Sequence, residues 1–169
     1  SGLDTSKVTS MTSMFYGCSS LTSLDLTPFD TSNVTDMSFM FRNCSSLYSF
    51  GLSSFDTSSV TDMSHMFAGC SSFYFSSLDL THFDTSNVTD MSCMFLNCSG
   101  LSSLGFSSLG FSSPFDTSSV TDMSYMFCGC SRLSSLNLSH FDTSHVTDMS
   151  CMFSGCSSLD YVDTYYFDT

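Results

Sequence analysis

The chain has 169 residues, of which 16 are acidic and only 3 are Lys or Arg, so its formal net charge is −13. Because so few cations cannot neutralise a phosphate backbone, and no apolar run reaches the roughly 20 residues of a membrane helix, this composition excludes nucleic-acid binding and membrane insertion. A hydrophobic content of 41%, with 18 Phe and 12 Met, excludes a disordered chain.

One motif, FDTSNVTDMSxMFxGCSSLxSLxLSx, recurs along the whole chain. Its Asp-Thr dipeptide returns at intervals of 26, 26, 28, 32, 26 and 26 residues, and the two longer intervals contain insertions at residues 74–77 and 102–114 that we expect to form loops. The sequence therefore predicts a single solenoid over residues 1–169, with about six repeats that start near Leu3, Phe29, Phe55, Phe83, Phe115 and Phe141.

Each repeat opens with Asp-Thr, so the carboxylates align in a column. One interpretation is an Asx-turn at every copy, since Asp favours turns. The alternative is a row of Ca²⁺ sites, because oxygen ligands suit a hard cation. The calcium candidates are Asp30, Asp56, Asp84, Asp116 and Asp142. Apart from this alternative, the sequence predicts no metal and no cofactor.

The next segment of each repeat carries apolar residues at helical spacing. In the second copy these are Val34, Met37, Phe41 and Cys44, preceded by Asp36 as a candidate N-cap. The residue before the Cys is Gly or Asn in every copy, and both types readily take a left-handed φ. The pattern predicts a short helical or 3₁₀ segment of about two turns that ends at this residue.

Each repeat ends with an L-x-x-L-x-L run, such as Leu21, Leu24 and Leu26, which is the strand signature of leucine-rich repeats. The fold class expected is thus a leucine-rich-repeat-like solenoid. Short parallel strands would line one side, and short helical or 3₁₀ turns would line the other.

The segment FDTSNVTDMSFMFRNCSSL and its copies, from about Leu3 to Leu159, resemble the BspA-like leucine-rich-repeat surface proteins of bacteria and some protists. The resemblance implies a secreted or surface-anchored solenoid that binds macromolecules of a host or a neighbouring cell. It implies no catalytic residues. The sequence stops at the start of a further copy of the motif, which predicts a fragment of a longer array.

Six of the nine Cys form a column, with one in each repeat. Buried thiols are the preferred interpretation of this column, and a ladder of disulfides is the alternative. The other three thiols lie in or next to the Met-x-x-Met segment, where one bridge is plausible and one thiol would remain over. These three are Cys93, Cys128 and Cys151.

No nucleophile–base pattern, phosphate loop or pair of acids appears, so we expect a protein that is not an enzyme. The favoured hypothesis is an extracellular or cell-surface module for adhesion and protein–protein interaction. Exposed residues on the strand side are expected to form its contact face. The candidates are Thr22, Asp25, Tyr48, Asp79, Asn137 and Asp160.

Two alternatives remain. Neither end of the sequence resembles a polar cap, so copies are candidates for head-to-tail stacking into a structural filament. A weaker alternative is ice binding by the Thr column that follows the Asp column, although Thr stacking for stability explains the same column. The column consists of Thr31, Thr57, Thr85, Thr117 and Thr143.

Overall fold

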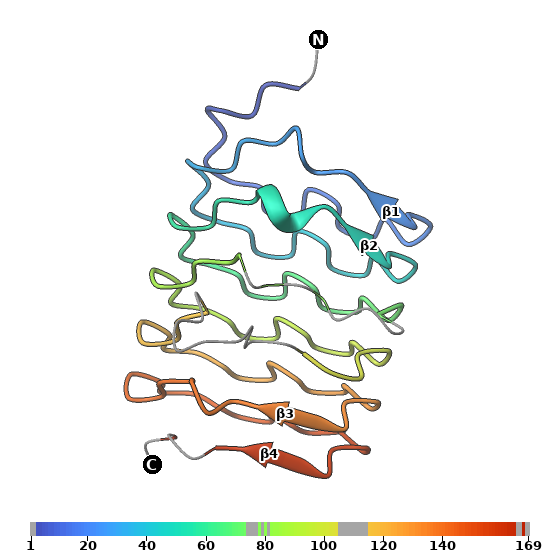
Figure 1. The fold of residues 1–169 in the computed structure, drawn as a ribbon, viewed down its shortest axis with the longest axis vertical. Coiled ribbons are helices and arrows are strands. Elements are labelled where there is room, and N and C mark those ends of the chain that lie inside the picture. Colours follow the sequence, from blue (N-terminus) through green and yellow to red (C-terminus); the bar gives the residue numbers. More distant parts are fainter. Residues whose placement is uncertain are drawn as a thin grey trace.

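A computed structural model describes residues 3–73, 78, 80, 82–104, 115–164 and 167. The chain winds back and forth as a stack of similar rungs, each of which is one sequence repeat, and the two termini lie at opposite ends of the stack (Figure 1). No helix in the described ranges has the length and apolarity required to cross a bilayer.

Short parallel strands form in the Leu-rich segments, as the sequence predicts. Strand β1 (Ser23–Leu24) pairs with β2 (Ser49–Phe50), and β3 (Ser135–Asn137) pairs with β4 (Tyr161–Asp163). A 3₁₀ turn, η1 (Leu52–Ser54), follows β2. Within β3 the Leu side chain is buried and its two neighbours are exposed, which is the alternation expected of a strand that covers a core.

The prediction of a short helical or 3₁₀ segment before the Cys of each repeat is wrong. From Met37 to Cys44 the backbone forms successive turns in which Met40, Arg42 and Cys44 donate to the carbonyl three residues earlier. The residues between them donate across the stack instead: N–H groups of Met37, Phe39, Phe41 and Asn43 reach carbonyls of Asp62, Ser64, Met66 and Ala68 at 2.7–3.0 Å. Because alternate N–H groups bond to the next rung, they cannot form the i→i−4 bonds of a helix.

Two residues in each of these segments have a left-handed backbone. In the second rung they are Phe39 (φ 60°) and Asn43 (φ 62°). The second of them is the Gly/Asn position, where the left-handed φ was correctly predicted. The first was missed. Asp36, which was expected to be an N-cap, closes an Asx-turn instead, since its Oδ1 accepts the N–H of Ser38 at 2.9 Å.

Isolated parallel bridges continue the ladder along this side. They join Ser10, Asp36, Asp62, Asp90, Asp122 and Asp148 in sequence. The same alternate donation recurs between each pair of these rungs. On this side of the stack, backbone hydrogen bonds to the neighbouring rung therefore hold the chain in place of a regular helix or a long strand.

The core consists of columns of identical side chains. One column of Phe rings stacks at centroid distances of 5.6–5.9 Å, with interplanar angles of 9° or less; it runs through Phe15, Phe41, Phe67, Phe95, Phe127 and Phe153. Met and Val columns are fully buried in the four rungs between the first and the last. Burial of each large apolar side chain contributes about 1.5–3 kcal/mol, so every interior rung is held by the rungs on both sides.

Three expectations concern residues beyond those described. They are the loop at 74–77, most of the insertion at 102–114, and the contact candidate Asp79.

Candidate binding faces of the stack

The Asp residues that open each repeat have a structural role. Oδ1 of Asp30 accepts the N–H of Ser32 at 3.1 Å and its hydroxyl at 2.7 Å. These bonds hold the pKa of Asp30 below its usual range, against a smaller opposing effect of the Asp4 charge. In each of the other copies, Oδ1 of the Asp likewise accepts the N–H of the Ser two residues later; these are Asp56, Asp84, Asp116 and Asp142.

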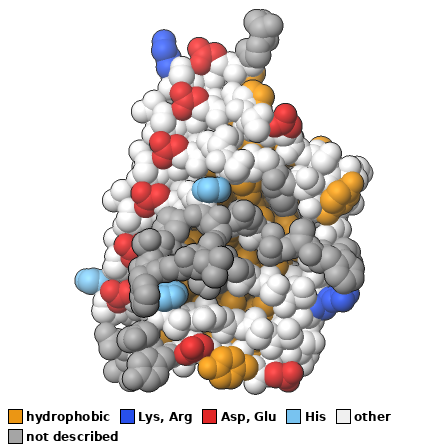
Figure 2. Space-filling model, viewed as in Figure 1, with side chains coloured by type: hydrophobic (Ala, Val, Ile, Leu, Met, Phe, Trp, Pro, Cys, Tyr) orange, Lys and Arg blue, Asp and Glu red, His pale blue; other side chains and the backbone are white. Residues whose placement is uncertain are grey.

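The Asx-turn interpretation is therefore confirmed for this column. In the described part of the chain, no group of three or more His, Cys, Asp or Glu residues is placed to hold a metal ion. The row remains strongly charged, and Figure 2 shows acidic side chains at intervals along one edge of the molecule.

The Thr column proposed for ice binding is buried, so that assignment is wrong. Thr31 is 1% exposed, and its hydroxyl donates to the carbonyl of Asp56 while accepting the Asp56 N–H. A hydroxyl held between two rungs cannot contact an ice surface. Its role is stabilisation of the stack.

A second Thr column is exposed and was missed. The hydroxyl of Thr35 donates to the carbonyl of Thr9 at 3.2 Å, and Thr61, Thr89, Thr121 and Thr147 repeat this contact. The signal was present in the Val-Thr pair, which recurs in all six copies and is followed by Asp in five of them. These hydroxyls also bond between rungs.

All nine Cys are free thiols in the structure. In the Cys column, every Sγ after that of the exposed Cys18 donates to the Phe carbonyl of the preceding rung, as Cys70 does to Phe41 at 3.1 Å. Burial raises the pKa of Cys44 to about 11 and that of Cys130 to about 12. The column therefore behaves as the preferred interpretation expected, as small buried groups.

The predicted bridge among the three other thiols stays a prediction. Cys151 is exposed, whereas Cys93 and Cys128 are half-buried. Burial raises the pKa of Cys93, and the charges of Asp122 and Asp90 raise it further, against a lowering effect of Arg42.

The contact candidates on the strand side lie on several rungs. The Tyr48 side chain is 58% exposed. Asp25 accepts from the N–H and hydroxyl of Thr27, and Asn137 accepts from the N–H of Ser139. Their carboxylate and amide oxygens thus also close local turns. Thr22 and Asp160 are bonded to neighbouring rungs through their backbones.

A different face, which we call the turn face, carries the two variable positions of the Met-Ser-x-Met-Phe-z segment. Position x is occupied by Ser13, Phe39, His65, Cys93, Tyr125 and Cys151. Position z is occupied by Tyr16, Arg42, Ala68, Leu96, Cys128 and Ser154. None of these positions was singled out as a contact face from the sequence.

A small aromatic and cationic cluster lies on the turn face. The rings of Phe39 and His65 stack at 4.5 Å with an interplanar angle of 9°, and the Arg42 guanidinium lies 5.4 Å from the Phe39 centroid. Burial and the Arg42 charge lower the pKa of His65, against opposing effects of Asp90 and Asp62. Arg42 Nε and His65 Nδ1 are buried without a hydrogen-bond partner among the described residues.

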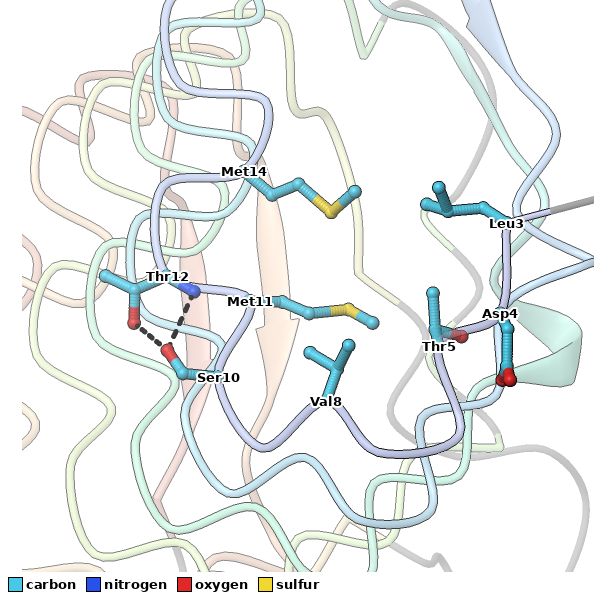
Figure 3. A pocket seen from close by; sticks show the side chains of 8 residues that line it. All are labelled: Leu3, Asp4, Thr5, Val8, Ser10, Met11, Thr12 and Met14. Atoms are coloured by element: carbon cyan, nitrogen blue, oxygen red, sulfur yellow. Dashed lines mark hydrogen bonds between the residues drawn. The ribbon is translucent and has the colours of Figure 1, made fainter.

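A hollow of about 410 Å³ lies at the first rung, between Leu3, Val8, Met11 and Met14 (Figure 3). Its Val and Met correspond to Val34, Met37 and Met40 of the next rung, which are fully buried. The hollow is therefore an uncovered section of the core rather than a site built for a small molecule.

The sequence matches the family described as "Mycoplasma protein of unknown function, DUF285" over residues 1–104 and 74–169. None of the curated proteins matches the chain. A leucine-rich repeat protein from Bacteroides ovatus ATCC 8483 is similar in structure, with 22% identity and a TM-score of 0.48. The similarity covers 90% of this chain and 39% of that protein.

Proposed function

The chain belongs to the DUF285 family, and from this premise we propose that it is a non-enzymatic binding module at the cell surface or outside the cell. Its partners would be macromolecules of a host or a neighbouring cell. The observation that carries the proposal is that the constant and the variable positions of each rung lie in different places. The Val, Met, Phe and Cys residues that build the stack recur in all six copies, whereas the residues at the variable positions x and z, apart from the buried Ala68, are at least partly exposed.

The repeated polar side chains make hydrogen bonds within the stack, which supports a role without catalysis. Catalysis needs reactive side chains, such as a nucleophile or a general acid or base, that are free to act on a substrate. Here the repeated Asp and Thr side chains close turns or join rungs. The buried Cys have raised pKa values, which disfavours the reactive thiolate.

Adhesion of coated beads tests the proposal. Beads that carry the folded chain are added to epithelial monolayers and to immobilised matrix proteins. Matched beads carry the heat-denatured chain, which has the same net charge. We expect several-fold higher retention of the folded chain on at least one of these surfaces. Equal retention of both kinds of bead on every surface would contradict the proposal.

End-to-end stacking is a second candidate, and the hydrogen-bond polarity of the rungs favours it. Among the described residues, the N–H groups of Met149, Cys151, Phe153 and Gly155 have no acceptor in the stack. At the other end of the stack, the corresponding carbonyls of the first rung accept no backbone N–H from the described part of the chain; they are those of Ser10, Thr12, Met14 and Tyr16. Any further copy of the motif, on this chain or another, would meet matching groups in register.

Sedimentation at increasing concentration tests stacking. We expect the average mass of the chain to rise with concentration. Met149→Asp should suppress the rise, because it places a charge on an exposed apolar end, and Tyr48→Asp should not. A single monomeric species throughout would contradict this second candidate.

A further inference from the structure

The turn face retains strained residues where strain is avoidable. All six residues at position x have a left-handed φ of 55–60°, yet none is Gly or Asn. Four residues further along, the other left-handed position is Gly or Asn in every rung. A left-handed backbone costs free energy for residues with a Cβ, and most of all for bulky ones. Stability alone would therefore favour Gly or Asn at both positions, so the side chains at x serve another purpose.

Variation among the repeats is concentrated on the same face. The two Met, the Phe and the Cys of this segment are identical in all six copies. Position x holds five residue types in six copies, and position z holds six types in six copies. Side chains that vary on an invariant scaffold are what a surface adapted to a particular partner requires.

The composition of the turn face is that of a protein interface. Neither column contains a carboxylate, although the molecule has 16. Phe39, His65 and Arg42 form the stacked cluster, and exposed Tyr16 and Tyr125 occupy the same two columns, one rung before the cluster and two rungs after it. Tyr, Phe and Arg are enriched at the centres of protein interfaces, where Asp is depleted. A guanidinium packed on an aromatic ring is also a frequent interface anchor.

Acidic side chains border this centre. The row of Asp36, Asp62, Asp90 and Asp122 lies three residues before position x, and Asp62 and Asp90 are close enough to His65 to act on its pKa. The whole molecule carries a net charge of −13. A charge of this size attracts a basic partner over long range.

We propose that the turn face is the docking surface for a basic protein partner, with Phe39, His65 and Arg42 as its anchor and the neighbouring Asp row as its rim. The proposal rests on the proposed function as a binding module and assigns the contact to this face instead of the strand side. Apolar or aromatic side chains of the partner pack on the anchor, and its Lys and Arg residues lie over the Asp row.

Selection from a random peptide library displayed on phage tests the proposal, with the immobilised folded chain as the target. We expect enriched peptides that carry a net positive charge and at least one large apolar residue. Phe39→Gly suits the left-handed backbone, so it should fold, and it should weaken peptide binding by about tenfold or more. Tyr48→Gly is the matched control on the strand side and should leave affinity unchanged. Thermal melts of both variants verify their folding.

Three outcomes would overturn the assignment. They are an affinity for Phe39→Gly within about twofold of the unmodified chain, enrichment of acidic peptides, and failure to enrich any peptide. Bead adhesion that persists in Phe39→Gly but disappears in Tyr48→Gly would reject the turn face and leave the proposed function standing. If beads that carry the unmodified folded chain adhere no better than beads that carry the denatured chain, the proposed function itself would be rejected.

Discussion

At the scale of single residues, the strained position x offers a direct test of the backbone. Ser13 has φ 59° and is exposed. Relief of left-handed strain gains about 1–2 kcal/mol, and the added freedom of Gly in the unfolded chain costs about 0.5–1 kcal/mol. Ser13→Gly should therefore increase the free energy of unfolding by up to about 1.5 kcal/mol, measured by urea denaturation.

The matched control for this substitution is Ser23→Gly, in an exposed position of β1. No left-handed strain is relieved there, so only the entropic cost remains, and stability should fall by about 0.5–1 kcal/mol. If both variants lose stability equally, position x is not strained.

Thiol reactivity is a second property of single residues. Cys18 and Cys151 are exposed, whereas Cys44, Cys70, Cys98 and Cys130 are fully buried and donate to carbonyls. Burial also raises the pKa of the buried group, so little thiolate forms at mildly alkaline pH. Iodoacetamide should label the first two in the folded chain and spare the last four. Mass spectrometry of digests gives the pattern, and a denatured sample in which all nine react is the control.

At the scale of elements, alternation of Gly and Asn follows from contact between adjacent turns. A Cβ on Gly69 would collide with Oδ1 of Asn43, and one on Gly129 would collide with Oδ1 of Asn97. The Asn side chain of one rung thus occupies the space beside the Gly of the next. Gly155 differs, because its neighbour across the stack is Gly129 and a Cβ there meets only backbone atoms at 3.4–3.5 Å.

Two substitutions at this position should consequently differ in cost. Both Gly69→Asn and Gly155→Asn keep a residue that tolerates a left-handed φ, but only the first overpacks its neighbour. We expect Gly69→Asn to lower the free energy of unfolding by about 1–3 kcal/mol and Gly155→Asn to change it by less than about 1 kcal/mol. Chemical denaturation measures both. Equal costs would show that the Asn side chain moves aside freely.

The sequence predicted the solenoid, the parallel strands at the Leu-rich segments and the Asx-turns, because each depends on spacing or on one residue type. The prediction failed for the segment from Val34 to Cys44. The apolar residues there have the spacing of a helix, but the backbone forms turns in which alternate N–H groups bond to the next rung. The buried state of Thr31 and the outward position of Phe39 escaped prediction for the same reason. Both depend on contacts between rungs that are about 26 residues apart in the chain.

At the scale of the whole molecule, the repeated carboxylates make stability sensitive to acid. Hydrogen bonds from Ser hold the pKa of Asp4, Asp30, Asp56 and Asp142 below the ordinary value of 3.8. A lowered folded pKa contributes stability that is complete above the unfolded value and is lost as pH falls through the folded one. The melting temperature should therefore be flat near neutral pH and fall as the pH decreases through the unfolded value of 3.8 and below it.

Asp30→Asn is the control for this pH dependence. The amide oxygen still accepts the bonds from Ser32, but it does not titrate. Its melting temperature should be lower at neutral pH and should decline less on acidification. A melting temperature that rises on acidification would mean that relief of repulsion along the Asp row outweighs the hydrogen bonds.

On the turn side, the hydrogen bonds that run from Met37, Phe39, Phe41 and Asn43 to the next rung all use backbone atoms. The side chain at position x takes no part in them, and φ changes by only 5° whether the residue is Ser, Phe, His, Cys or Tyr. Residues can therefore be exchanged there one at a time without a compensating change in the scaffold. Duplication of a rung would add one more such position and leave the existing ones in place, so the extent of the contact surface follows the copy number of the repeat.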